Sequence, residues 1–176
     1  MSQTISTLPT VKDLLLAQLD REAVLTRKAI ERVPEGRNDF KPHLKSMELG
    51  YLAALVAAMP GWIPLITDRD ELNLDDPSNG VFRTKAADTN AELIANFEIA
   101  MTAGRQALEA TTEERLMGQW GFKMRGMEFP RQARHVAIAD SVFSHLAHHR
   151  GQLTVYLRLN EAAVPALYGP SADEQV

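Results

Sequence analysis

The sequence predicts an all-α protein, a four-helix bundle of the up-down-down-up type with a long crossover. Four segments place apolar residues three and four positions apart, the spacing of a helix with one buried face. No long stretch alternates apolar and polar residues as a half-buried strand does. With 176 residues, 45% of them hydrophobic, a single domain over residues 1–176 can bury a core without cross-links.

The first two predicted helices lie in the N-terminal third of the chain. The first spans about residues 11–32, and Thr10 with Asp13 three positions later is a plausible capping arrangement at its start. The second spans about residues 46–59, with the serine at its start as the expected cap. Pro60 and the glycine after it are expected to stop this helix.

A loop over about residues 68–88, rich in Asp, Asn, Pro and Gly, is long enough for the crossover. The third helix is expected to start at Thr89, with Glu92 completing a capping box. Residues 118–132 contain glycines and alternating bulky side chains, and either a short hairpin or an irregular loop fits them. The fourth helix is expected over about residues 131–160.

Composition excludes several functional classes. The 19 Lys and Arg against 23 Asp and Glu give a net charge of −4, and these charges are scattered, which argues against a nucleic-acid partner. The absence of cysteine excludes disulfides and thiolate metal ligands. The N-terminus lacks a secretory signal pattern, and we expect no apolar stretch near the roughly 18 residues of a membrane span. The sequence therefore predicts a soluble, cytoplasmic protein with no membrane partner.

Three of the five histidines fall within one short run of the fourth predicted helix. His145 and His149 are one turn apart, which can place two imidazole nitrogens on one metal ion. His148 is rotated by about 100° from His149 and is better placed to contact a neighbouring helix or a substrate. Arg150 and Gln152 lie beside the pair and are candidate substrate-binding residues together with His148. The alternative is a histidine cluster that is hydrogen-bonded within the protein and holds no metal.

A third metal ligand is not evident from spacing, although catalytic zinc sites usually take three protein ligands. His135 lies ten residues before His145, about 15 Å along the same helix, and cannot reach the same ion. His43 precedes the second predicted helix and is more naturally a loop residue.

Two stretches resemble the DinB-like superfamily of metalloenzymes: residues 145–174, HLAHHRGQLTVYLRLNEAAVPALYGPSADE, and residues 39–62, DFKPHLKSMELGYLAALVAAMPGW. The resemblance covers both ends of the domain, and HHRGQLTVYLR is its most specific element. It implies a four-helix bundle, often a homodimer, in which three histidines hold a divalent metal such as zinc or nickel. It also implies that His145 and His149 are two of these ligands.

The sequence departs from this family pattern at the third ligand. Aligning LGYLAALVA with the family's second helix puts Leu55 where a histidine is expected, and leucine cannot bind a metal. Tyr51 lies one turn earlier and Glu48 about two turns earlier. Whether His43, Glu48 or Tyr51 replaces the missing ligand is left open at this point.

Two hypotheses about function follow. The first is a metal-free descendant that binds a small ligand or simply dimerises. The second is a divalent-metal-dependent enzyme, of the thiol transferase or hydrolase type, with the metal on His145 and His149. In that enzyme a bound cation would activate a thiol cofactor or water by lowering its pKa.

Overall fold

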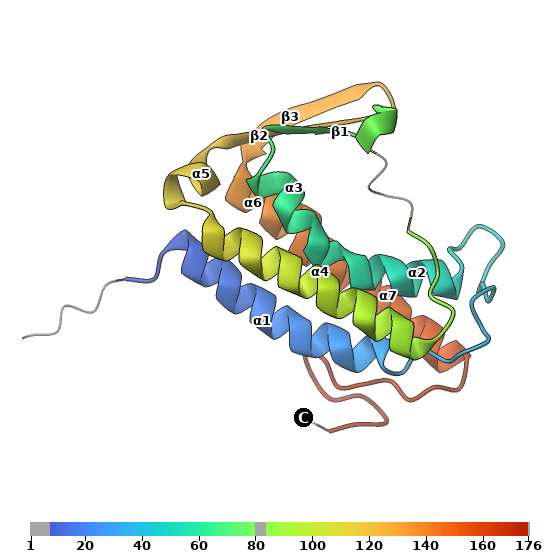
Figure 1. Ribbon diagram of the computed structural model, residues 1–176. Helices are drawn as coiled ribbons and strands as arrows, with labels where there is room; N and C mark the ends of the chain where they lie inside the picture. Colours follow the sequence, from blue (N-terminus) through green and yellow to red (C-terminus); the bar gives the residue numbers. More distant parts are fainter. Residues whose placement is uncertain (1–7, 80–83, 176) are drawn as a thin grey trace, which may run out of the picture.

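The computed structural model describes residues 8–79 and 84–175. Its long helices lie side by side, and a small sheet covers one end of them (Figure 1). The four helices that carry most of the core are α1 (Val11–Ile30), α2 (Leu49–Ala58), α4 (Asn90–Ala110) and α7 (His145–Leu159). The prediction of a mainly helical protein is therefore confirmed, whereas the prediction of an all-α class needs correction.

The correction is a three-stranded sheet in the order β1-β2-β3. Its strands are β1 (Glu71–Asn73), β2 (Gln119–Met124) and β3 (Met127–Ala133). Strand β1 pairs in parallel with β2, and β2 pairs antiparallel with β3. Of the two alternatives left open for residues 118–132, the hairpin is the one observed. Strand β1 escaped prediction because three residues are too few to show an alternating pattern.

Two residues with positive φ close the hairpin, Arg125 at 54° and Gly126 at 72°. This conformation suits the two-residue turns that match strand twist. Both of their backbone N–H groups donate to the Asp75 carboxylate, at 2.7 Å each. The loop after β1 therefore holds the tip of the hairpin.

The α-helix α2 ends at Ala58, within one residue of the predicted end before Pro60. The chain nevertheless stays helical beyond this point, through the 3₁₀ helix η1 (Met59–Trp62) into α3 (Ile63–Thr67), which the sequence did not predict. Pro60 and Pro64 each fall in the first turn of a new helical segment, η1 and α3, the position that tolerates a proline best. Its start also differs, because Glu48 rather than a serine is the N-cap residue and makes no side-chain cap bond.

The same segment corrects the expectation about apolar stretches. Leu49–Thr67 has 19 residues and a mean hydropathy of 1.7, which by length and composition alone is enough to cross a membrane. Of its most apolar window, 72% is buried inside the protein. Such burial is what a core helix of a globular protein shows.

The helix starts at Thr10 and Thr89 agree with prediction. The Thr10 hydroxyl accepts the Asp13 N–H, and the Asp13 carboxylate accepts the Thr10 N–H at 2.9 Å, which completes a capping box. The Thr89 hydroxyl likewise accepts the Glu92 N–H. The Glu92 carboxylate accepts from the Asp88 N–H at 2.8 Å, one residue earlier than a capping box requires.

The hydrogen-bond pattern of the fourth helix changes partway along its length. It consists of α6 (Arg134–Ile138), a π-helical segment η3 (Ala139–Ser144) and α7, and it starts later than expected because residues up to Ala133 belong to β3. Within it the His145 N–H donates to the Asp140 carbonyl, five residues back. Such π-turns are rare and are often found at functional sites. The remaining short elements are η2 (Pro77–Asn79) and α5 (Glu113–Met117).

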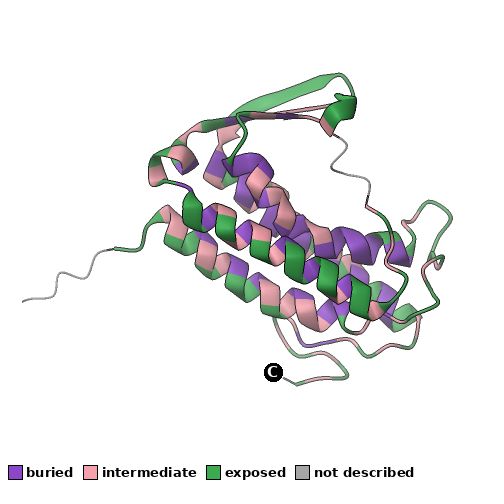
Figure 2. Cartoon of the chain, viewed as in Figure 1, coloured by how far each residue is buried: buried purple, intermediate pink, exposed green. Residues whose placement is uncertain are grey.

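Buried residues follow the inner sides of the helices, whereas the outer face of α4 is largely exposed (Figure 2). One apolar cluster joins α2, α4 and α7 and includes Leu52, Phe97 and Leu153. A second cluster lies beneath the sheet and includes Ile63 and Trp120.

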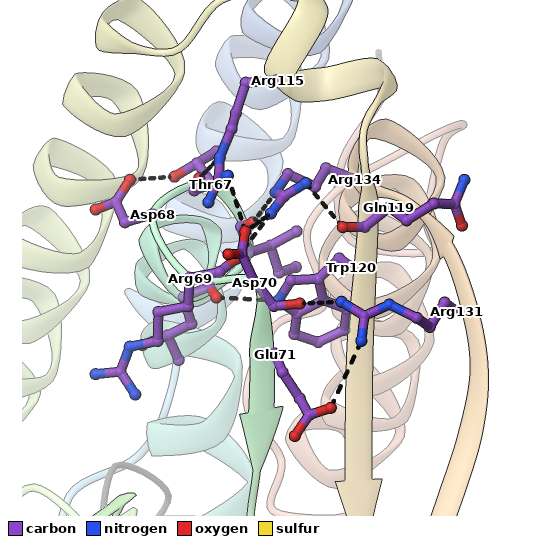
Figure 3. A network of polar contacts seen from close by, with 12 residues as sticks. Thr67, Asp68, Arg69, Asp70, Glu71, Arg115, Gln119, Trp120, Arg131 and Arg134 are labelled. Carbon is purple, nitrogen blue, oxygen red and sulfur yellow. Dashed lines mark hydrogen bonds and ion pairs between the residues drawn. The ribbon is translucent and has the colours of Figure 1, made fainter.

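Side chains from the sheet side cap the C-terminus of α3 (Figure 3). The carbonyls of the last turn accept from Trp120 Nε1, Arg134 Nε and Arg115 Nε, at 3.2, 2.9 and 2.8 Å. Asp70 neutralises both guanidinium groups at 2.6 and 2.8 Å. These bonds satisfy carbonyls that a helix end leaves unpaired, and they fix the sheet over the end of α3.

Candidate functional site

His145 and His149 face each other on α7. Their Nε2 atoms are 2.9 Å apart, and their ring centroids are 4.6 Å apart. The Nδ1 of His149 lies 2.7 Å from the Gln152 side-chain oxygen, which can only accept a hydrogen bond. Nδ1 of His149 therefore carries a hydrogen, and in the neutral ring Nε2 presents a lone pair.

The other histidine has a similar restraint. His145 makes a hydrogen bond with the Ser141 backbone, and a carbonyl in that place accepts from the ring. The π register makes this carbonyl accessible, because the His145 backbone N–H donates to Asp140 and not to Ser141. With Nε2 directed at His149, the nitrogen left for Ser141 is Nδ1.

The close approach of the two Nε2 atoms, at 2.9 Å, has two chemical explanations. The rings can share one hydrogen, or both lone pairs can be directed at a common partner such as a water molecule, which can reach them because both rings are only partly buried.

Partial burial works against a positive charge on either ring. The pKa of His145 is lowered below its usual 6.5 by burial, opposed by the Ser141 hydrogen bond and reinforced by the charge of His148. Burial also lowers the pKa of His149, opposed by the Gln152 hydrogen bond. Both rings are therefore neutral near pH 7.

A cavity of about 390 Å³ lies against His145, between the α2–α3 helix, the sheet and η3. Its walls are mainly apolar. The aromatic part of the walls consists of the rings of Tyr51, Trp62, Trp120 and Phe122. The Trp62 ring lies 5.6 Å from the His145 ring, and Ser141 lines the cavity beside it.

The donor set does not fit a three-ligand metal centre. Within residues 8–79 and 84–175, no group of three or more His, Asp or Glu side chains is placed to hold a metal ion. Leu55, at 9% exposure, forms part of the cavity wall. The described residues therefore leave the histidine pair one protein ligand short of such a centre.

The other candidates for a third ligand lie elsewhere or carry no sign of that role. Glu48 pairs with Lys41 at 3.0 Å. His43 lies in an exposed loop, where its Nδ1 accepts from the Lys45 N–H at 3.1 Å. His135 contacts the Leu116 carbonyl at 3.1 Å. Tyr51 alone shares the cavity wall with His145 and Leu55.

The three predicted substrate-binding residues fall into different surroundings. Gln152 orients His149 through its side-chain oxygen. His148 is exposed, and its ring lies edge-on to that of His149 at 4.9 Å. Arg150 is fully buried and points to α1, where it pairs with Glu22 at 2.6 Å. A substrate contact of any of these residues stays a prediction.

Sequence reasoning did not identify the part of the cavity wall that comes from the sheet, and it did not single out Ser141. The alternating bulky side chains between positions 118 and 132 were a signal for this wall, because Trp120 and Phe122 from this segment line the cavity. Ser141 offered no signal, since its role depends on the π register of η3.

Comparison with known proteins gives a consistent result. A model of the DinB family matches residues 1–175. The structure of a DinB-like protein from Bacillus cereus is similar, with a TM-score of 0.66, 19% identity and coverage of 88% of this chain and 95% of that one. A DinB-like protein from Bacillus subtilis gives a TM-score of 0.62, 18% identity and coverage of 86% and 95%. No curated protein matches the chain.

Proposed function

The chain belongs to the DinB family, and we propose that it is a metal-free member that binds a small molecule in the cavity beside His145. The observation that carries this proposal is the cavity itself, about 390 Å³ in volume, mainly apolar and with a histidine in its wall. Ligand sites of proteins commonly have this size and combine apolar walls with a few polar groups.

Leu55 supports the metal-free form of the proposal. It stands where the family resemblance places the third histidine, and its side chain adds apolar surface to the cavity wall. The change removes a metal ligand and at the same time favours an apolar ligand.

A second candidate is a divalent-metal-dependent enzyme of the thiol transferase or hydrolase type, with the metal on His145 and His149. The observation that favours it is the convergence of the two Nε2 atoms, with each Nδ1 engaged by a protein acceptor. Histidine ligands in metal sites are oriented by bonds of this kind.

Elemental analysis of protein purified without an affinity tag separates the two candidates. We expect no stoichiometric zinc or nickel in the wild type, and about one ion per chain in Leu55→His, which restores a third ligand. About one ion per wild-type chain, lost in His149→Ala and kept in His135→Ala, would favour the enzyme.

Binding of naphthalene, followed by quenching of tryptophan fluorescence, tests the ligand site directly. Leu74 lines the cavity and is only half-buried, so Leu74→Trp can fill part of the cavity and should weaken binding at least tenfold. Leu159→Trp places the same side chain on an exposed position of α7 and serves as the matched control. Equal binding by all three proteins would place the ligand outside this cavity.

Two expectations of the sequence remain part of the proposal. One is a homodimer, which can be tested by measuring the molar mass with light scattering after size-exclusion chromatography. The other is a cytoplasmic location, which cell fractionation tests.

A further inference from the structure

We propose that the cavity takes up the alkyl chain of a free, single-chain carboxylate, whose carboxylate group stays outside the cavity and pairs with Lys85. The inference rests on the proposed function and adds the class of ligand, an anionic amphiphile. It depends on a second hollow of the molecule, which shares Thr84 with the wall of the cavity.

This second hollow, about 300 Å³ in volume, lies between α2 and α4. Small side chains from both helices line it, among them Ala54, Ala58 and Ala100. On α2 the two alanines lie three positions after Tyr51 and Leu55, which line the cavity. Residues three apart on a helix lie on neighbouring faces. The cavity and the second hollow are therefore neighbours around one helix.

The polar side chains of the second hollow are hydrogen-bond donors. They are the Thr84 hydroxyl, the Lys85 ammonium and the Asn96 amide, and within residues 8–79 and 84–175 none of the three side chains has a hydrogen-bond or ion-pair partner. No described residue that lines either hollow is Asp or Glu, and Lys85 is the one charged side chain among those described. Such a set suits a carboxylate, which only accepts hydrogen bonds.

The two hollows thus suit the two parts of an amphiphile. None of the described residues of the cavity wall is charged, and each methylene group that leaves water there should strengthen binding about fourfold. A carboxylate cannot follow the chain inside, because a buried ion without a counter-ion is strongly disfavoured. Lys85 directly follows Thr84 of the cavity wall, with the two Cα atoms about 3.8 Å apart, and offers the counter-ion at this border.

Octanoate, 1-octanol and octylamine test the inference, because at pH 7.5 they carry a negative charge, no charge and a positive charge on the same chain. Titration calorimetry with a chelator compares them. We expect octanoate to bind at least about threefold tighter than 1-octanol, as for an exposed ion pair, and about tenfold tighter than octylamine. The advantage over 1-octanol should shrink in about 0.5 M salt. Hexanoate, two methylenes shorter, should bind about tenfold weaker than octanoate.

Two variants locate the two parts of the ligand. Lys85→Glu should bind octylamine tighter than octanoate, whereas Lys45→Glu, in an exposed loop outside both hollows, should keep the wild-type order. Leu74→Trp fills part of the cavity and should weaken octanoate binding at least about tenfold, with Leu159→Trp as its control. The comparison of the three compounds on wild-type protein needs no variant.

Three results would overturn the inference. One is equal binding of octanoate and 1-octanol, the result expected if a second copy of the chain covers the second hollow. The others are an unchanged order in Lys85→Glu and unweakened octanoate binding in Leu74→Trp. If naphthalene still quenches the tryptophan fluorescence in that case, the small-molecule site stands. Failure of naphthalene and of all the alkyl compounds to bind would instead overturn the proposed function.

Discussion

Two faces of helix α7 hold polar side chains in different surroundings. Arg150 points to α1, and its two terminal nitrogens donate to Glu22, to Thr26 and to the Tyr168 hydroxyl, while its Nε finds no acceptor among the described residues. His149, the preceding residue, faces His145, whose ring lines the cavity. Adjacent positions thus carry an ion pair held within the protein and a histidine pair beside an open cavity. The second kind of environment is where binding is to be sought.

The largest loss of stability is expected from Glu22→Ala. It leaves the Arg150 guanidinium, at 0% exposure, without its carboxylate, and breaking a buried pair in this way typically costs about 3–5 kcal/mol of the free energy of unfolding. Urea unfolding measures the loss. The control is Asp20→Asn on the same helix, which disrupts an exposed pair with Arg105 and should cost less than about 1 kcal/mol. Similar losses in both variants would mean that the buried pair has no special role.

A smaller loss is expected from Tyr168→Phe. The Tyr168 hydroxyl donates to the Glu22 carboxylate at 2.9 Å, and its ring lies 5.2 Å from the Arg150 guanidinium. The variant keeps the ring and loses the hydrogen bond, so the free energy of unfolding should fall by about 1 kcal/mol. No change in urea unfolding would show that the C-terminal tail does not support the ion pair.

The histidine face should tolerate the loss of both polar groups. In His145→Phe/His149→Leu the partly buried polar pair is replaced by apolar side chains, so the free energy of unfolding should stay within about 1 kcal/mol of the wild type or rise. Thermal and urea unfolding measure it. A loss of about 3 kcal/mol would assign the pair a structural role like that of Arg150.

The smallest effect is a dependence of stability on pH. The pKa values of His145 and His149 are lowered mainly by burial, so between the folded and unfolded pKa values the unfolded chain binds more protons. Their contribution is complete above about pH 6.5, the unfolded value, and is lost as pH falls through the folded pKa values. Unfolding at pH 7.5 and 5.5, with a chelator, should show this loss in the wild type. The double histidine variant should show less of it, and identical profiles would contradict the lowered pKa values.

The parts of this structure that sequence reasoning predicted are local in sequence. The starts of α1 and α4 were predictable because Thr10 and Thr89 cap them through residues three positions away. The contact between His145 and His149 was predictable because two residues four apart on a helix share a face.

The parts that escaped prediction depend on distant partners. The chain stays helical past Pro60 because η1 and α3 pack against α4, while Pro60 itself falls in the first turn of η1, where a proline is tolerated. Strand β1 exists through its parallel pairing with β2, a segment far along the chain. Arg150 looked like a site residue from its position beside His149, and only the packing of α7 against α1 shows that Glu22 is its partner.

The apolar helix from Leu49 to Thr67 has a consequence for synthesis of the protein. Its burial depends on contacts with α4 and α7, which leave the ribosome after it. Until residues up to about Leu159 are available, the nascent chain exposes a segment as apolar as a membrane span. The helix that forms the core of the mature fold is therefore the segment that chaperones or membrane-targeting factors are most apt to bind during translation.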